Sequence, residues 1–270
     1  MALPKHPRAV VTGAGSGLGR ALSLELASRG ARLLLADIDD AGLAETARLT
    51  GAAGAETATV RCNVAVAAEV EALAVAADER MGGSDLVVNN AGVAVGGLVG
   101  EIPVTDWEWI MGVNLWGVIY GCHSFLPRMK RQKSGHVLNI ASTAGLIHAP
   151  GMAPYNVTKA GVVALSETLA AELHGTGVGV TVLCPTFFKT NIFKSARATG
   201  EAAAKAPVEK LMARARLQAD GVARYAIDAV AAGRLHALPH EDGRWLWRAK
   251  RAAPGFFSTT VLGNGQRFFK

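Results

Sequence analysis

Two side chains that could exchange a proton lie one helical turn apart in the run Tyr155-Asn-Val-Thr-Lys159. Residues four apart share one face of a helix. A free tyrosine has a pKa of about 10 and is a poor base at neutral pH. A neighbouring ammonium favours the phenolate and lowers that pKa. Ser142 precedes Tyr155 by thirteen residues, at the end of an apolar run, and could hydrogen-bond the oxygen whose proton is exchanged.

A glycine-rich run, Thr12-Gly-Ala-Gly-Ser-Gly-Leu-Gly19, lies between an apolar run and a segment with helical spacing. The spacing of Gly13, Gly17 and Gly19 lets a backbone approach a diphosphate closely. The N-terminus of the following helix would supply N–H donors to the same group. The run therefore predicts a dinucleotide site at the start of the chain.

Asp37 lies 18 residues past Gly19, where the second apolar run ends. A carboxylate at this place accepts the ribose hydroxyls of NAD and repels the 2′-phosphate of NADP. The nearby Ala14, Ser16 and Ile38 are uncharged, whereas a phosphate would need a basic partner. The alternative is that Asp37, like the two acidic residues after it, only caps the next helix. The position relative to the glycines favours NAD.

Short apolar runs alternate with segments of helical spacing along most of the chain. The apolar runs are 8–12, 31–36, 57–63, 85–89, 136–141 and 179–183, and the helical segments are 18–27, 41–49, 66–81, 107–131 and 155–174. This alternation predicts an α/β fold with a doubly wound parallel sheet of Rossmann type. It predicts a single domain over 1–243 with a helical lid at about 191–219 and a C-terminal tail at 244–270. Asp220 is expected to cap a helix at 222–232 that ends at Gly233, before a last strand at 234–238.

These motifs, taken together, resemble the short-chain dehydrogenase/reductase family. The resemblance covers residues 8–190 and rests on the glycine run, Asn89-Asn90-Ala91-Gly92, Asn114, Ser142 and the Tyr155–Lys159 pair. It implies an enzyme that transfers a hydride between NAD and a secondary alcohol or ketone. Tyr155 is then the base in oxidation and the acid in reduction. Lys159 also holds the nicotinamide ribose, and Asn114 anchors a water that relays protons.

The resemblance also implies the cofactor contacts. They are Gly13, Ser16, Gly17, Leu18, Gly19, Asp37, Ile38, Asn63, Val64, Asn90, Ala91, Gly92, Tyr155, Lys159, Pro185 and Thr190. Two places depart from the family pattern, because Asn63-Val64 replaces Asp-Val and Pro185-Thr186 replaces Pro-Gly. Thr186 does not adopt positive φ freely, so the loop that contains it is expected to follow a different path.

The residues around the expected substrate pocket are mainly apolar. They include residues 145–152, Phe187, Phe188 and Phe193, with His148 as a candidate polar contact. This composition predicts a substrate that carries a sizeable hydrophobic group. The alternative is that the phenylalanines pack under the lid, and the sequence favours neither.

The 270 residues are 50% apolar and 19% charged, which excludes a disordered or fibrous chain. The start of the chain lacks the apolar segment of a secretory signal. Cys62, Cys122 and Cys184 are odd in number and far apart. They are typical of buried thiols in a reducing compartment, so a cytoplasmic protein is expected. No histidine or cysteine spacing indicates a metal site.

The net charge of +6 gathers near the end of the chain, since residues 192–270 hold 14 basic and 6 acidic residues. No nucleic-acid motif accompanies them. The tail carries Trp245, Trp247, Phe256, Phe257, Phe268 and Phe269. It predicts either an interface within a dimer or tetramer or attachment to an anionic membrane surface. Pro254 and Gly255 break any long amphipathic helix and favour the homo-oligomer.

Two rivals to an NAD-dependent dehydrogenase remain. One is a ketone reductase that uses NADPH. The other is a sensor or scaffold that binds a dinucleotide without catalysis. The set Ser142, Tyr155 and Lys159 argues against the second, because a protein that only binds gains little from keeping it.

Overall fold

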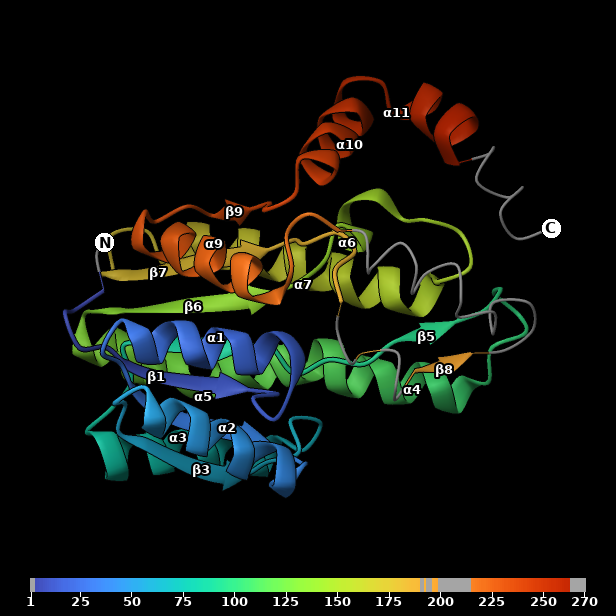
Figure 1. The fold of residues 1–270 in the computed structure, drawn as a ribbon. Helices are drawn as coiled ribbons and strands as arrows, with labels where there is room; N and C mark the ends of the chain where they lie inside the picture. Colours follow the sequence, from blue (N-terminus) through green and yellow to red (C-terminus); the bar gives the residue numbers. More distant parts are fainter. Residues whose placement is uncertain (1–2, 190–191, 193–195, 199–214, 263–270) are drawn as a thin grey trace.

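A twisted parallel sheet of seven strands forms the centre of the computed structural model, which describes residues 3–189, 192, 196–198 and 215–262 (Figure 1). The strand order is β3-β2-β1-β4-β6-β7-β9, and every pair is parallel. The strands are β1 Arg8–Thr12, β2 Arg32–Asp37, β3 Thr57–Arg61, β4 Leu86–Asn89, β6 Gly135–Ile140, β7 Val178–Leu183 and β9 His236–Ala237. The order reverses between β1 and β4, which confirms the doubly wound Rossmann-type fold.

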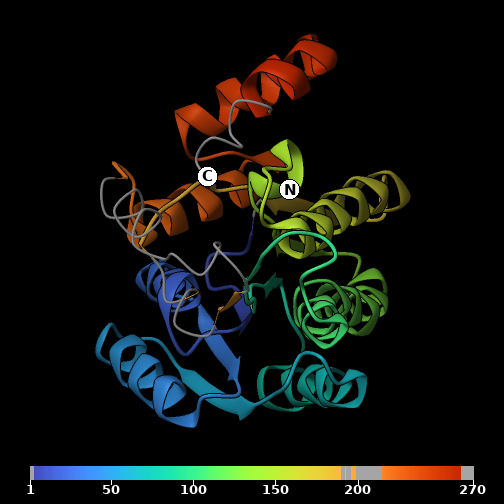
Figure 2. The ribbon, with the colours of Figure 1, turned by 90° about the vertical axis from the view of Figure 1, so that its right-hand side faces the viewer.

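Helices cover both faces of the sheet (Figure 2). One face carries α1 Gly17–Ser28, α2 Asp40–Ala52 and α9 Ala219–Ala231. The other carries α3 Ala67–Met81, α5 Gly117–Gln132 and α7 Ala153–Glu172. The central strands are apolar along their whole length because both of their faces are buried. The two cores hold the carboxyl ends of the strands, and the loops that follow them, in fixed places.

The boundaries expected for the strands, from the apolar runs, and for the helices agree with the structure to within a few residues. The exception is the segment 107–131. That segment is divided into α4 Val104–Met111, a π-helical turn η1 Gly112–Trp116 and α5. π-Helical turns inside α-helices are rare, and those that occur often lie at functional sites. The turn contains Asn114, which is one of the candidate site residues.

The C-terminal part differs from the expectation in one detail. Asp220 is not the N-cap of α9, which begins at Ala219 after Gln218. Asp220 lies in the first turn, where the helix dipole favours a carboxylate. Gly233 follows the helix with a φ of +63°, as expected. Of the expected lid, the structure describes only short pieces, among them β8 Arg197–Ala198, which pairs with β5 Val95–Gly96.

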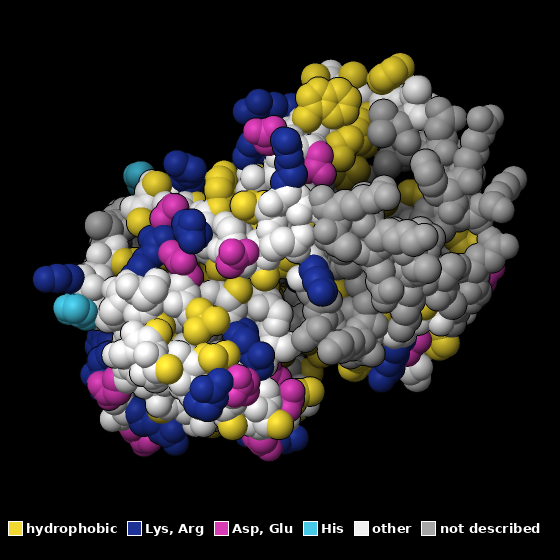
Figure 3. Space-filling view, in the orientation of Figure 1, with side chains coloured by type: hydrophobic (Ala, Val, Ile, Leu, Met, Phe, Trp, Pro, Cys, Tyr) yellow, Lys and Arg dark blue, Asp and Glu magenta, His cyan; other side chains and the backbone are white. Residues whose placement is uncertain are grey.

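The chain ends in an arm formed by α10 Glu241–Ala252, α11 Pro254–Phe256 and the π-helical segment η3 Phe257–Leu262. Both ribbon views show the arm projecting beyond β9 (Figures 1 and 2). Trp247 and Phe257 pack against the core, whereas Trp245 and Phe256 are each 65% exposed. Hydrophobic atoms accordingly gather on the surface of the arm (Figure 3). Within the described part of the chain, no helix combines the length and the apolar character that crossing a bilayer requires.

The three cysteines, Cys62, Cys122 and Cys184, are all buried and free. Burial raises the pKa of each thiol, to about 11 for Cys62 and to about 12 for the other two. The thiols therefore stay protonated at neutral pH and behave as small apolar side chains.

Candidate active site

The candidate residues converge where the loops after β1, β4, β6 and β7 meet, at the carboxyl edge of the sheet. In open α/β sheets this edge holds the ligand, next to the point where the strand order reverses. The loop after β1 contains the glycine run, and the loop after β4 contains Asn90, Ala91 and Gly92. Ser142 lies two residues after Ile140, the last residue of β6, and the loop after β7 contains Pro185.

The glycine loop is packed too closely for side chains. Gly13 and Gly17 have φ values of +64° and +52°. A Cβ atom at Gly13 would lie 2.7 Å from the Cα atom of Ala91, and one at Gly19 would collide with the carbonyl of Gly13. Asn90 braces the loop, because its amide nitrogen donates to the carbonyl oxygens of Thr12 (2.8 Å) and Gly13 (3.1 Å). Asn90 thus shapes the loop.

Helix α1 begins directly after this loop and offers donors to an anion. Its N-cap residue, Ser16, makes no side-chain cap hydrogen bond. The first N–H groups of a helix have no partner within the helix. The backbone of Gly17, Leu18 and Gly19 can therefore hold the diphosphate of a dinucleotide.

Asp37 ends β2 with its carboxylate against the glycine loop. Oδ2 accepts from the N–H of Gly15 (2.8 Å), and Oδ1 accepts from the N–H of Ile38 (2.7 Å). The alternative that Asp37 caps α2 is wrong, because the N-cap is Asp39, which accepts from the N–H of Gly42. Oδ1 also accepts from the N–H of Asp39 (3.1 Å), so Oδ2, which has a single partner, is the oxygen with a lone pair left for a ribose hydroxyl.

Sequence reasoning missed a basic residue beside this carboxylate. Arg20, in α1, donates from Nη2 to the carbonyl of Gly15 (2.5 Å) and from Nε to Oγ1 of Thr46 (2.9 Å). One sign of this residue was visible in the sequence, because Arg20 directly follows the last glycine of the run, Gly19. The guanidinium is engaged by the protein, where it ties the glycine loop to α2.

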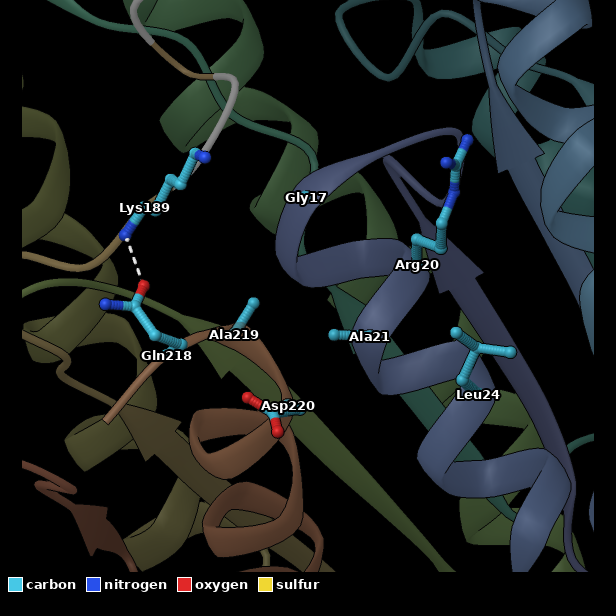
Figure 4. Close-up of a pocket in the computed structure, with 8 residues that line it drawn as sticks. All are labelled: Gly17, Arg20, Ala21, Leu24, Lys189, Gln218, Ala219 and Asp220. Carbon is cyan, nitrogen blue, oxygen red and sulfur yellow. Dashed lines mark hydrogen bonds between the residues drawn. The ribbon is translucent and has the colours of Figure 1, made fainter. Parts of the chain in front are cut away.

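An open hollow of about 600 Å³ adjoins the glycine loop (Figure 4). Its lining residues are Gly17, Arg20, Ala21, Leu24, Lys189, Gln218, Ala219 and Asp220. Sequence reasoning missed Lys189 and Gln218, which face α1 across the hollow and are joined by a hydrogen bond from the Lys189 N–H to Gln218 Oε1 (3.0 Å). Thr190, the next candidate cofactor residue, lies outside the described residues.

Asn63 and Val64 lie shortly after β3, at the place where the family commonly has Asp-Val. Oδ1 of Asn63 accepts from the N–H of Ala65 (3.1 Å), which is a local turn of the kind that Asn favours. The acceptor of the side chain is engaged, so its N–H groups are the part left for a ligand. Val64 is buried, and its side chain leaves no room for a Cβ atom at Gly117.

Ser142, Tyr155 and Lys159 lie together at the ends of β6 and β7. Ser142 Oγ donates to the carbonyl of Pro185 (3.4 Å) and accepts from the N–H of Ala144 (3.1 Å). Lys159 is buried, donates to the carbonyl of Ile140 (2.8 Å) and lies 5.7 Å from the Tyr155 ring centroid. These contacts hold the ammonium beside the phenol.

Burial governs the protonation of this pair. It raises the pKa of Tyr155 to about 12, although a hydrogen bond with Ser142 acts in the opposite direction. It also lowers the pKa of Lys159 to about 8. Without further positive charge at the site, the phenol therefore stays protonated at neutral pH. A cationic ligand in contact with the pair would favour the phenolate.

Asn114 is completely buried in the π-helical turn. Its Oδ1 accepts from the N–H of Val93 (2.8 Å), and its Nδ2 donates to the carbonyl of Val93 (2.9 Å). The side chain thus pairs with the backbone after β4. Gly92 lies between this residue and the lysine, since a Cβ atom there would be 3.4 Å from Asn114 Oδ1 and 3.7 Å from Lys159 Nζ.

The expected substrate contacts are only partly brought together. His148 is exposed, and both ring nitrogens are engaged, by the Gly145 carbonyl (3.1 Å) and by Nζ of Lys250 in the arm (2.8 Å). This pairing occupies the polar atoms of the ring, and a contact between His148 and a substrate stays a prediction. Phe188 is buried in the core and Phe187 is 41% exposed, while Phe193 lies outside the described residues.

Among the residues that the structure describes, no three His, Cys, Asp or Glu side chains gather closely enough to hold a metal ion. The polar groups of the site are instead a phenol, an ammonium, a hydroxyl and the amides of a glycine loop. Together with the doubly wound sheet, they define a Rossmann-type protein in which groups able to exchange a proton lie near a loop able to bind a diphosphate.

Comparison with known proteins identifies the family. A family model described as short chain dehydrogenase matches residues 7–201. The CLA biosynthesis dehydrogenase/reductase of Lactiplantibacillus plantarum is 37% identical over 186 residues, which make up 68% of this chain and 65% of that protein. The 2-(R)-hydroxypropyl-CoM dehydrogenase of Xanthobacter autotrophicus is 36% identical over 186 residues, 67% of this chain and 74% of that protein.

A solved structure extends the similarity to most of the chain. It is a crystal structure of a short chain dehydrogenase/reductase from Burkholderia phymatum in complex with NAD, with 39% sequence identity and a TM-score of 0.89. The similarity covers 94% of this chain and 96% of that chain. The chain therefore belongs to the short-chain dehydrogenase/reductase family of oxidoreductases.

Proposed function

We propose that this protein transfers a hydride between NAD(H) and a secondary alcohol or ketone that carries a hydrophobic group. The observation that carries the proposal is the convergence of Ser142, Tyr155 and Lys159 at the sheet edge that also holds the glycine loop. When bound, the nicotinamide accepts or supplies the hydride. The residues of the chain exchange the accompanying proton and orient the oxygen.

In the oxidation direction Tyr155 accepts the hydroxyl proton of the alcohol, and in reduction it donates a proton to the carbonyl oxygen. Lys159 stabilises the phenolate by its charge and is held in place by the Ile140 carbonyl. Ser142 turns its hydroxyl from the Pro185 carbonyl to the substrate oxygen, whose developing charge it stabilises. Asn114 keeps the chain after β4 in place and is the candidate anchor of a proton-relaying water.

The choice of NAD rests on Asp37, whose carboxylate borders the glycine loop and would repel a 2′-phosphate. The Burkholderia phymatum relative was solved with NAD, which supports the same choice. The NADPH-dependent alternative would need a free basic group at this place. Arg20 is nearby, and its Nε and Nη2 already donate to Thr46 and Gly15.

Asp37→Asn tests the cofactor choice. Removing the charge should lower kcat/KM for NAD by about tenfold and raise kcat/KM for NADP by a similar factor, because a charged hydrogen bond is worth about 1.5–3 kcal/mol. Steady-state kinetics with both cofactors measures the two changes. Asp40→Asn is the matched control, since Asp40 is exposed and 3.7 Å from Arg61. A wild-type enzyme that prefers NADP would refute the assignment.

A panel of alcohols and ketones, followed by the absorbance of reduced cofactor, tests the reaction class. Turnover should be highest for secondary alcohols with alkyl or aryl substituents, because the partly exposed Ala149, Pro150 and Met152 and the exposed Phe187 are apolar. Turnover confined to small polyols would reject the hydrophobic substrate. Cofactor binding without any turnover would favour the sensor or scaffold instead.

The proposal extends to the cellular form of the protein. The arm carries the exposed rings of Trp245 and Phe256, and a second copy of the chain would cover them in a dimer or tetramer. Three buried free thiols suit a reducing compartment such as the cytoplasm.

A further inference from the structure

The peptide group that joins Pro185 to Thr186 is held at both ends. Its carbonyl oxygen accepts from Oγ of Ser142 (3.4 Å) and from the N–H of Thr143 (2.9 Å). Its N–H donates to Nδ1 of His240 (3.2 Å). A peptide group is planar, and in the trans form its C=O and N–H point in opposite directions. The direction of the N–H bond to His240 therefore fixes the direction of the carbonyl that holds Ser142.

The ring of His240 has one orientation and one tautomer. A backbone N–H can only donate, so Nδ1 must be the acceptor for Thr186. Nε2 lies 3.3 Å from the carbonyl of Leu217, which can only accept, so Nε2 carries the proton. The ring of Phe188 stacks on the imidazole, with 6.2 Å between centroids. The histidine thus joins the loop after β7 to the segment that precedes α9.

The arm is packed directly against these loops. His240 is the N-cap residue of α10, and Thr186 Oγ1 donates to Asp242 in its first turn (3.2 Å). A Cβ atom at Gly243 would lie 2.8 Å from Cγ2 of Thr186 and 3.0 Å from Oγ1 of Thr143. The beginning of α10 is therefore part of the catalytic end of the molecule.

Thr186 gives this arrangement a definite backbone conformation. The family commonly has glycine here, and glycine adopts positive and negative φ with similar ease. Thr186 is not among the residues with positive φ. A β-branched residue restricts the backbone, and the hydrogen bond to His240 selects one direction for the peptide group. These features fix the path of the loop at a place where the family commonly has glycine.

We propose that His240 is a positioning residue for the reaction, acting on Ser142 through the Pro185–Thr186 peptide. The proposal rests on the proposed function, in which the Ser142 hydroxyl orients the substrate oxygen. The carbonyl of Pro185 gives that hydroxyl one resting direction. If the peptide group turned, Ser142 would lose this acceptor and the serine hydroxyl would adopt other rotamers.

Two amide substitutions separate the roles of the ring nitrogens. In His240→Asn the side-chain oxygen takes the place of Nδ1 and can still accept from Thr186. In His240→Gln the amide reaches the place of Nε2, so the contact with Leu217 survives and the acceptor for Thr186 is lost. Displacing a catalytic group by about 1 Å costs about 100-fold in rate. We expect kcat to fall at least about tenfold in the Gln variant and less than about threefold in the Asn variant.

The Kd for NAD, measured by protein fluorescence without alcohol, should change less than kcat in both variants, because Pro185 is one contact among many and the glycine loop and Lys159 form most of the proposed cofactor site. Melting temperatures report any general loss of structure. Equal losses of kcat in the two variants, in step with equal losses of melting temperature, would overturn the proposal. Wild-type kcat in the Gln variant would overturn it as well.

Hydrogen exchange of the Thr186 amide gives a measurement that does not depend on the reaction. Its rate should rise about tenfold in the Gln variant and remain near the wild-type rate in the Asn variant, since losing a hydrogen bond costs about 1 kcal/mol or more. Unchanged exchange in the Gln variant would overturn the proposal. If the wild type turns over no alcohol or ketone, the proposed function fails, and the exchange comparison still decides whether His240 holds this peptide.

Discussion

Tyr155→Phe is expected to lower turnover by about 10³-fold while the Kd for NAD stays within about twofold. The substitution removes only the hydroxyl oxygen, and with it the group that exchanges the proton. General acid–base catalysis contributes about 10²–10⁴ to enzymatic rates. The ring still packs with the cluster of Val95, Ile102 and Ile110, so the fold should be retained. Single-turnover kinetics in both directions, with NAD binding measured separately, gives the two quantities.

Tyr120→Phe is the matched control. Tyr120 lies in α5, where its ring stacks on Trp116 at 5.6 Å between centroids, and its hydroxyl has no role in the proposed mechanism. Losing this hydroxyl should leave kcat unchanged. If Tyr155→Phe also kept its turnover, the proton would have to move through another group and the proposed mechanism would fail.

The dependence on pH follows from the same hydroxyl. Burial raises the pKa of Tyr155 to about 12 in the structure without cofactor. Oxidation needs the deprotonated phenol, so its rate should rise with pH, by up to about tenfold per unit below the pKa. Reduction needs the protonated phenol and should not gain from alkaline pH. A bound, positively charged nicotinamide would lower the pKa of Tyr155, and the rate of oxidation would then rise at a pH closer to neutrality. In Tyr155→Phe this pH dependence should disappear.

The sheet could be predicted closely because its signal is local. The run that predicts β1, Arg8–Thr12, is matched residue for residue, and the run at 31–36 is displaced by one residue from β2. Strands buried on both faces read as continuous apolar runs between turn residues. The order of the site motifs along the chain was likewise visible, since the glycine run and Asn90 directly follow strands and Tyr155 lies in the first turn of a helix.

Contacts between segments far apart in the sequence could not be predicted. The π-helical turn arises where Asn114 pairs with the backbone of Val93, a contact that periodicity does not encode. The pairing of His148 with Lys250 joins residues 102 apart. Asp220 failed as a cap because several polar residues near a helix start compete for that place, and helix ends are uncertain by one or two residues.

The contacts of the arm with the loop after β7 could not be predicted for the same reason. Its composition suggested a basic aromatic tail whose role lay in contacts with other molecules. The structure instead joins its N-cap residue, His240, and Asp242 in its first turn to Thr186 in the loop after β7. A single substitution for the family glycine was the only local sign of this contact. Its meaning became clear only when the partner segment, 54 residues further along, was placed beside it.

Gly145→Ala is expected to lower kcat by about 100-fold through geometry alone. Gly145 lies three residues after Ser142, and α6 Ala144–Ile147 packs directly on α7, the helix of Tyr155 and Lys159. A Cβ atom at Gly145 would lie 2.5 Å from the carbonyl carbon and oxygen of Lys159. Because both contacts are backbone atoms, the two segments must move apart by about 1 Å, and such a displacement costs about 100-fold in rate.

The control for this substitution is Gly51→Ala in α2, where a new Cβ atom meets nothing within 4 Å. Alanine in place of glycine in a helix stabilises by about 0.5–1 kcal/mol, so the control should melt slightly higher and keep its kcat. Gly145→Ala should melt lower and lose kcat, while the glycine loop, which the change does not touch, still binds NAD. The opposite outcome would be a Gly145→Ala variant that keeps both its kcat and its melting temperature. In that case the close contact of α6 with α7 could not be what aligns Ser142 with Tyr155 and Lys159.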